Sequence, residues 1–296
     1  MLNPAGFKQA LPTKLMLNPS GFKRALQKID SLGSTPGVLV KVIKLANDIN
    51  TDMSSINALL RNDGPLVADI IRISNSPYYA PVTPHSNLNS ALNMLGMSEV
   101  IRMVNLSLAR QLFARDLTSY GVSAFDYWSS SVASALVMAA VAKKIRLNSE
   151  DAYTLGILHA IGRVLINRVI EEKGFSIFWD AEEPIEKWEC DSVGVDFAEA
   201  GSMLLNHWHF PNSMCEIISK QLRPEPLGDH PSMLGALQFT RRLLDLTGWD
   251  FEKKDWQLPS DDPFMSVAGL TPDWVSEMVS ICREDFQKLL MTVDLK

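Results

Sequence analysis

Helical periodicity dominates the chain. Between residues 36 and 48, Val38, Val42, Ile43 and Leu45 recur at the spacing that places side chains on one face of an α-helix. The same spacing predicts helices over residues 65–74, 97–115 and 126–146. No segment sustains the apolar and polar alternation of a strand. The sequence therefore predicts an all-α, multi-helix protein.

Capping residues and helix breakers set the expected boundaries. We expect Ser54 or Ser55 to begin a short helix through Leu60, and Ser149 to begin another that ends near His159. Further helices are predicted over residues 88–95, 163–173, 174–188 with a break near Pro184, 196–209, 211–222, 233–247 and from 271 onward. Loops are predicted over residues 81–87, 223–231 and 256–270.

Composition and charge narrow the class of protein. The 296 residues are 46% hydrophobic and 21% charged, which excludes a wholly disordered chain. The formal net charge of −6 argues against nucleic-acid binding, which needs a clustered basic face; the small groups at 143–146 and 241–242 are interpreted as helix ends or solvated faces. Three cysteines without a CxxC pair, Cys190, Cys215 and Cys282, favour a reducing, cytoplasmic setting.

No segment is apolar for long enough to span a membrane. The most apolar window, residues 132–142, is shorter than the roughly 20 residues that a bilayer requires, and it predicts a buried helix instead. The N-terminus lacks the basic and apolar regions of a secretory signal, so we expect the protein in the cytoplasm.

The chain opens with a short duplication. Residues 1–11 recur as residues 16–26 with two differences, and each copy can begin a helix with an Asn cap followed by Pro. One repeated unit cannot build a solenoid, so we interpret residues 1–15 as a duplicated, peripheral segment. A short helix that binds a partner is the alternative.

Five stretches, in order across residues 31–225, resemble the HDOD family, helical signalling domains related to the HD-type metal-dependent phosphohydrolases. They are residues 34–39 (STPGVL), 63–79 (DGPLVADIIRISNSPYY), 89–96 (NSALNMLG), 156–162 (GILHAIG) and 200–211 (AGSMLLNHWHFP). The resemblance implies a helical domain over 16–225, with an N-terminal part (16–125) and an HD-related part (126–225). Residues 226–296 are then a C-terminal helical extension.

By this resemblance, an HD hydrolase holds one or two metal ions between His and Asp side chains, and the metal activates a water against a phosphate ester. This chain departs from that pattern. The first His position of the HD pattern is aligned with Ser130, and the adjacent His-Asp pair with His159-Ala160. The later His position of the pattern falls at Gln221. We therefore expect no metal, no other cofactor and no catalytic residue. His159 is expected to be hydrogen-bonded inside a relic of the HD site.

Two other groups bear on ligand binding. Arg163 directly follows the 156–162 stretch and could hold an anion without a metal. A surface position on its helix is the alternative. His207 and His209 lie about 200° apart around a helix, so they cannot chelate one ion from one face.

The remaining residues of the five stretches that resemble the family are interpreted first as structural. Asp63 and Pro65 fit a helix start, and Asn75 fits a helix end, although its amide could instead hold a neighbouring loop. Gly96 fits a position after a helix, and Trp208 fits a core anchor. Ser76 and Pro211 complete this set.

The leading functional hypothesis is a non-catalytic bacterial regulatory protein of signal transduction. It would bind a signalling protein or a small phosphorylated ligand in the relic site. One alternative is a metal-dependent phosphohydrolase with a rearranged ligand set. The other is a scaffold that binds only proteins, which an exposed apolar patch over residues 233–247 would favour.

Overall fold

Helices make up the regular structure of the chain. The computed structural model describes residues 37–46, 51–174, 176–223, 228, 230–248, 251, 253 and 262–291. Within these ranges no strand forms, and Leu117 and Val122 make an isolated antiparallel bridge. The fold is therefore all-α, as the periodicity predicts.

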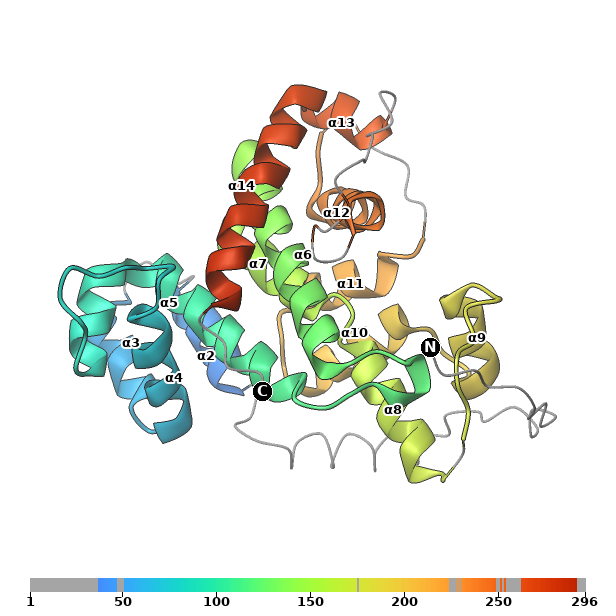
Figure 1. The fold of residues 1–296 in the computed structure, drawn as a ribbon, viewed down its shortest axis with the longest axis horizontal. Coiled ribbons are helices and arrows are strands. Elements are labelled where there is room, and N and C mark those ends of the chain that lie inside the picture. Colours follow the sequence, from blue (N-terminus) through green and yellow to red (C-terminus); the bar gives the residue numbers. More distant parts are fainter. Residues whose placement is uncertain are drawn as a thin grey trace.

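The helices nearest the N-terminus gather in one lobe (Figure 1). They are α2 (Gly37–Ala46), α3 (Met53–Leu60), α4 (Gly64–Ser74) and α5 (Leu88–Leu112), and the first three each pack on α5. α5 consists of two helical segments that meet at Gly96. The φ of this residue is +75°, which glycine adopts without strain, so the predicted helix break is confirmed.

Two helices form the centre of the molecule. They are α6 (Ala124–Lys144) and α7 (Ser149–Leu158), which pack closely on each other. Buried residues run along α6 from Tyr127 to Ala142, which confirms the buried helix predicted from the apolar window. α12 (Met233–Thr247) and α14 (Pro272–Leu290) pack against α6, and Figure 1 shows α14 in red beside it. The short α13 (Pro263–Ala268) packs on α12.

The remaining helices form the side of the molecule opposite the N-terminal lobe (Figure 1). They are α8 (Gly162–Glu172), α9 (Ile185–Val193), α10 (Phe197–His207) and α11 (Asn212–Lys220). α10 packs on both α8 and α11, and the 3₁₀ turn η1 (Thr118–Tyr120) contacts α8. This arrangement brings η1, α6, α8 and α9 together around the 156–162 stretch.

Several expected boundaries are confirmed at the level of hydrogen bonds. Asp63 caps α4 by accepting the Leu66 N–H at 3.0 Å, and Asp196 caps α10 by accepting the Glu199 N–H at 2.8 Å. Thr271 caps α14 through the Trp274 N–H. These side chains satisfy amide groups that would otherwise have no partner in the first helical turn.

Four expectations about elements are wrong. Asp52, not Ser54 or Ser55, caps α3, because its carboxylate accepts the Ser55 N–H at 2.9 Å. Asn148, not Ser149, caps α7. The predicted helix before Pro184 is absent from residues 176–183, which are irregular, and the helix begins only at Ile185. The loop predicted over 256–270 contains α13, which Asp262 caps.

Some expectations lie outside the described residues. These include the duplicated segment at residues 1–26, most of the predicted linker at 223–231 and the first residues of the 34–39 stretch. None of the helices in the described ranges is long and apolar enough to cross a bilayer.

The apolar face of α12 is covered. Leu234, Leu237, Phe239 and Leu243 are buried, and the large apolar side chains exposed in the described part of the chain lie on other elements. The patch that would favour a protein scaffold is therefore not found over the described residues 233–247.

Candidate functional site

A cavity of about 200 Å³ lies beside His159 of the 156–162 stretch. Its walls come from the η1 region, α6, the end of α7, α8, α9, α10 and α12. Three residues predicted for the relic site line it: Ser130, His159 and Arg163. The other lining residues are mostly apolar or aromatic and include Leu117, Tyr120, Val122, Tyr127, Trp179, Ile185, Phe197 and Leu244, together with the charged Glu186, Arg241 and Asp245.

His159 is a neutral, hydrogen-bonded imidazole. It follows α7 directly, and its Nδ1 lies 2.8 Å from the carbonyl oxygen of Gly156. Burial lowers the pKa of His159 to about 3, and the positive charges of Arg241 and Arg163 act in the same direction against the Gly156 hydrogen bond. The hydrogen bond expected of His159 is present, to the carbonyl oxygen of Gly156.

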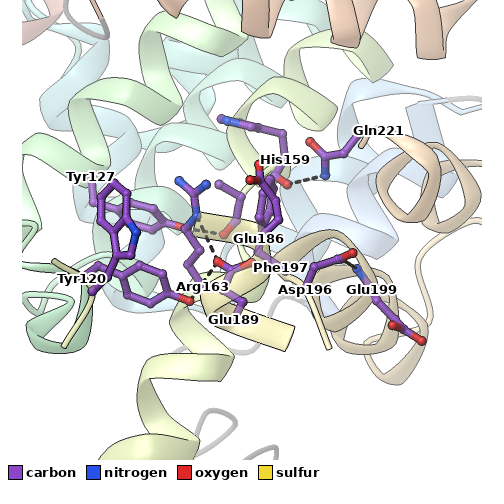
Figure 2. Close-up of polar contacts among 12 residues, drawn as sticks. Tyr120, Tyr127, His159, Arg163, Glu186, Glu189, Asp196, Phe197, Glu199 and Gln221 are labelled. Atoms are coloured by element: carbon purple, nitrogen blue, oxygen red, sulfur yellow. Dashed lines mark hydrogen bonds and ion pairs between the residues drawn. The ribbon is translucent and has the colours of Figure 1, made fainter. Parts of the chain in front are cut away.

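Arg163 is buried, so the alternative of a surface arginine is wrong. Its guanidinium carbon lies 4.3 Å from the ring centroid of Phe197 and 6.0 Å from that of Tyr120. Its Nε lies 3.5 Å from the Glu189 carboxylate (Figure 2). Stacking on aromatic rings and an ion pair together hold this cation in the cavity wall.

The position of Arg163 depends on a close helix crossing. It is the second residue of α8, directly after Gly162. A Cβ atom on Gly162 would lie 2.0 Å from the carbonyl oxygen of Phe197 on α10, so only glycine fits. This contact explains in physical terms why the 156–162 stretch ends in glycine.

Glu189 is a fully buried carboxylate that the sequence analysis did not single out. It accepts the Phe197 N–H at 2.7 Å and the Tyr120 O–H at 3.1 Å. Burial raises the pKa of Glu189 to about 7, although Arg163 and both hydrogen bonds oppose that change. No spacing pattern marks a single glutamate in α9 as buried, because its partners come from η1, α8 and α10.

Arg241 is the second arginine of the cavity, and α12 supplies it. Its guanidinium carbon lies 5.3 Å from the Phe197 ring centroid, so both cations contact the same ring. It donates to the carbonyl oxygen of Gln221 at 3.2 Å and lies 3.6 Å from the Glu186 carboxylate. The interpretation of residues 241–242 as a solvated face is wrong for Arg241, whose side chain is 24% exposed. Burial, followed by the charge of Arg163, lowers the pKa of Arg241.

The other predicted site residues stabilise the cavity wall. Tyr127 donates its hydroxyl to the carbonyl oxygen of Ala160, the residue that the resemblance aligns with the Asp of the HD pair. Gln221 donates its amide to the carbonyl oxygen of His159 at 2.7 Å (Figure 2). Ser130 donates its hydroxyl to the Tyr127 carbonyl oxygen at 2.9 Å. The structure therefore places Ser130, His159 and Arg163 at one cavity, and neither Ala160 nor Gln221 lines it.

None of the signature residues lines the cavity. Asp63 and Pro65 open α4, and Gly96 breaks α5. Asn75 follows α4, and its amide holds a loop. Ser76 and Trp208 are buried, and Pro211 precedes α11.

The residues present do not fit a divalent metal ion. In the described part of the chain, no three His, Cys, Asp or Glu side chains gather as a metal site would require. His159 contributes one ring nitrogen at most, because its Nδ1 is held by Gly156. Arg163 and Arg241 line the same space and would repel a dication.

A sequence profile of the HDOD domain matches residues 32–224. This match covers well over half of the chain, and the chain therefore belongs to the HDOD family.

Solved structures share the fold. The chain is 17% identical to an "HDOD domain protein with unknown function" of Geobacter sulfurreducens, with a TM-score of 0.68 over 94% of this chain and 97% of that one. It is 22% identical to a "Putative phosphohydrolase" of Shewanella amazonensis SB2B, with a TM-score of 0.63 over 92% and 98%. It is 19% identical to a "Putative signal transduction protein" of Marinobacter aquaeolei VT8, with a TM-score of 0.65 over 92% and 65%.

The shared fold extends beyond the matched domain. Residues 1–225 are only about three quarters of the chain, so coverage of 92% or more requires residues from 226 onward. A protein of Treponema pallidum (strain Nichols) is 23% identical over 201 residues, or 64% of this chain, and the chain spans 37% of the length of that relative.

Proposed function

We propose that this HDOD protein is a non-catalytic regulator of bacterial signal transduction, and that the relic HD site binds a small phosphorylated ligand. The supporting observation is that two arginines line this cavity and contact one aromatic ring, that of Phe197. Arg163 and Arg241 reach the cavity from α8 and α12, with His159 as the histidine of its wall. A guanidinium fork matches the geometry of a phosphate group and binds it without a metal.

Electrostatics favour an anion over a metal-bound water at this position. Arginine stays protonated at neutral pH even where burial lowers its pKa, so the cavity keeps both positive charges. Each charge is shared with a carboxylate, Glu189 for Arg163 and Glu186 for Arg241. Because the pKa of Glu189 is raised to about 7, its negative charge is incomplete at neutral pH and neutralises the charge of Arg163 only in part.

The test combines metal analysis with ligand titration. Protein purified without a metal-affinity column is analysed by plasma mass spectrometry, and ethyl phosphate is titrated by calorimetry. We expect substoichiometric metal, no turnover of phosphate esters and measurable binding of ethyl phosphate. Arg241→Gln should weaken that binding by about tenfold or more, the effect of one charge-assisted contact.

Arg242→Gln is the matched control. Arg242 neighbours Arg241 on α12 but pairs with Asp262, at 2.9 Å, and does not line the cavity. Stoichiometric iron, manganese or zinc that His159→Ala removes would overturn the proposal in favour of a phosphohydrolase. Absence of phosphate binding in the wild-type protein would favour the protein-only scaffold.

A further inference from the structure

The cavity contains hydrogen-bond acceptors as well as arginines. Nδ1 of His159 faces a carbonyl oxygen, which can only accept, so Nδ1 carries the ring proton and Nε2 is a bare lone pair. Burial and the two arginines oppose a second proton on the ring. His159 therefore offers an acceptor at neutral pH.

Ser130 contributes a second acceptor. The Ser130 hydroxyl donates its proton to the Tyr127 carbonyl oxygen, so toward a ligand its oxygen can only accept a hydrogen bond. The serine and the histidine both line the cavity, on α6 and after α7.

Two carboxylates complete the polar lining. Glu186 comes from α9 and Asp245 from α12, one helical turn after Arg241. Glu186 and Asp245 add two negative charges to the lining, beside the two positive charges of Arg163 and Arg241. A phosphate alone would neutralise the arginines but would face two carboxylates of its own sign. A ligand that also carries a positive charge or N–H donors satisfies both sets of groups.

The rest of the lining sets the size and character of the ligand. Leu117, Val122, Ile185 and Leu244 supply apolar wall, and the volume of about 200 Å³ admits a small molecule. Such walls raise the strength of each polar contact by excluding water.

We propose, building on the phosphate-binding function above, that the ligand is a phosphorylated amine. Its phosphate binds Arg163 and Arg241, and its ammonium donates to His159 Nε2 and to the carboxylates of Glu186 and Asp245. The site thus recognises both charged groups of a zwitterion. A simple phosphate ester contacts the arginines but leaves His159, Glu186 and Asp245 without a ligand group.

Two probes of matched skeleton test this proposal. O-phosphoethanolamine differs from ethyl phosphate by one ammonium group on the terminal carbon. Both are titrated into the full chain by calorimetry at neutral pH and constant ionic strength, which keeps charge screening equal. We expect O-phosphoethanolamine to bind at least tenfold more tightly.

Variants identify the side chains that bind the ammonium group. Asp245→Asn combined with Glu186→Gln should reduce the affinity ratio of the two probes to near one, while the affinity for ethyl phosphate stays equal or increases. Glu199→Gln is the control, because this exposed glutamate lies near the site on α10 without lining the cavity (Figure 2). It should leave the ratio unchanged.

The outcomes separate this inference from the proposed function. Equal affinity for the two probes in the wild-type protein would overturn the phosphorylated amine and leave phosphate binding intact. A ratio that survives the double carboxylate substitution would also overturn it. Failure of both probes to bind would overturn the proposed function itself.

Discussion

The side chain of Asn75 pairs with the main chain of His85 through both of its polar atoms. Its Nδ2 donates to the His85 carbonyl oxygen at 2.8 Å, and its Oδ1 accepts the His85 N–H at 2.7 Å. The amide therefore closes the loop that follows α4, which confirms the alternative that Asn75 holds a neighbouring loop. This role gives a physical reason for the residue in the Asn75-Ser76-Pro77 signature.

Asn75→Ala should destabilise the protein by about 2 kcal/mol, because it leaves both main-chain groups of the buried His85 without their partner. Urea unfolding followed by circular dichroism measures the change. Asn75→Asp keeps the acceptor but turns a carboxylate oxygen toward the His85 carbonyl oxygen, so it should destabilise the protein at least as much. An unchanged urea midpoint in Asn75→Ala would contradict the proposed stabilisation of the loop by the Asn75 amide.

Gly162→Ala should prevent stable folding or cost more than about 3 kcal/mol, because the new methyl group would collide with the main chain of α10. Soluble yield and thermal unfolding report the effect. Gly64→Ala serves as the control, since a Cβ there meets nothing within 4 Å. Similar stability of the two variants would show that α8 and α10 can separate at little cost.

His159→Gln should change how stability depends on pH. Folding lowers the pKa of His159 from 6.5 to about 3, so between these values the unfolded chain binds more protons and stability falls as the pH falls. The slope from one such group is at most about 1.4 kcal/mol per pH unit. Unfolding at several pH values from 8 to 4 should show the variant losing less stability than wild type on the acid side. Parallel curves would contradict a neutral His159.

Glu189→Gln should alter the pH dependence in the opposite sense. Folding raises the pKa of Glu189 from 4.5 to about 7, so the folded protein binds more protons in this window and stability falls as the pH rises through it. The variant lacks this loss, so its stability relative to wild type should increase between pH 5 and 7. Denaturant midpoints at each pH measure the difference, and a constant difference would exclude a raised pKa.

Local sequence signals were sufficient for most helices but not for the whole site. Asp63, Asp196 and Thr271 begin helices because their side chains cap the residues that follow them, which is a short-range property. The region before Pro184 has helical periodicity but stays irregular, where Trp179 instead bonds to the Ser119 carbonyl oxygen of the distant η1 turn. Tertiary contacts override propensity there.

Two of the residues missed in the site, Arg241 and Glu189, are missed for a related reason. Arg241 and Glu189 lie far from the 156–162 motif in sequence, and only the packing of α9 and α12 brings them to it. The family resemblance led to Ser130 and His159 as positions aligned with the HD ligands, and to Arg163 as the residue that follows the 156–162 stretch. It could not lead to Arg241, which belongs to the segment beyond the matched domain.

The packing of α12 and α14 on α6 has a consequence for synthesis on the ribosome. The last residue of α6 precedes the first residue of α14 by about 130 residues, so translation at roughly 5–20 residues per second separates them by roughly 6–25 seconds. During that interval α6 has been made without α14, and for the first part of it also without α12, although α7 follows α6 directly and packs on it. The nascent chain therefore passes through a stage in which part of the surface of its central helix is uncovered, and the cavity gains Arg241 with α12, before α14 is made.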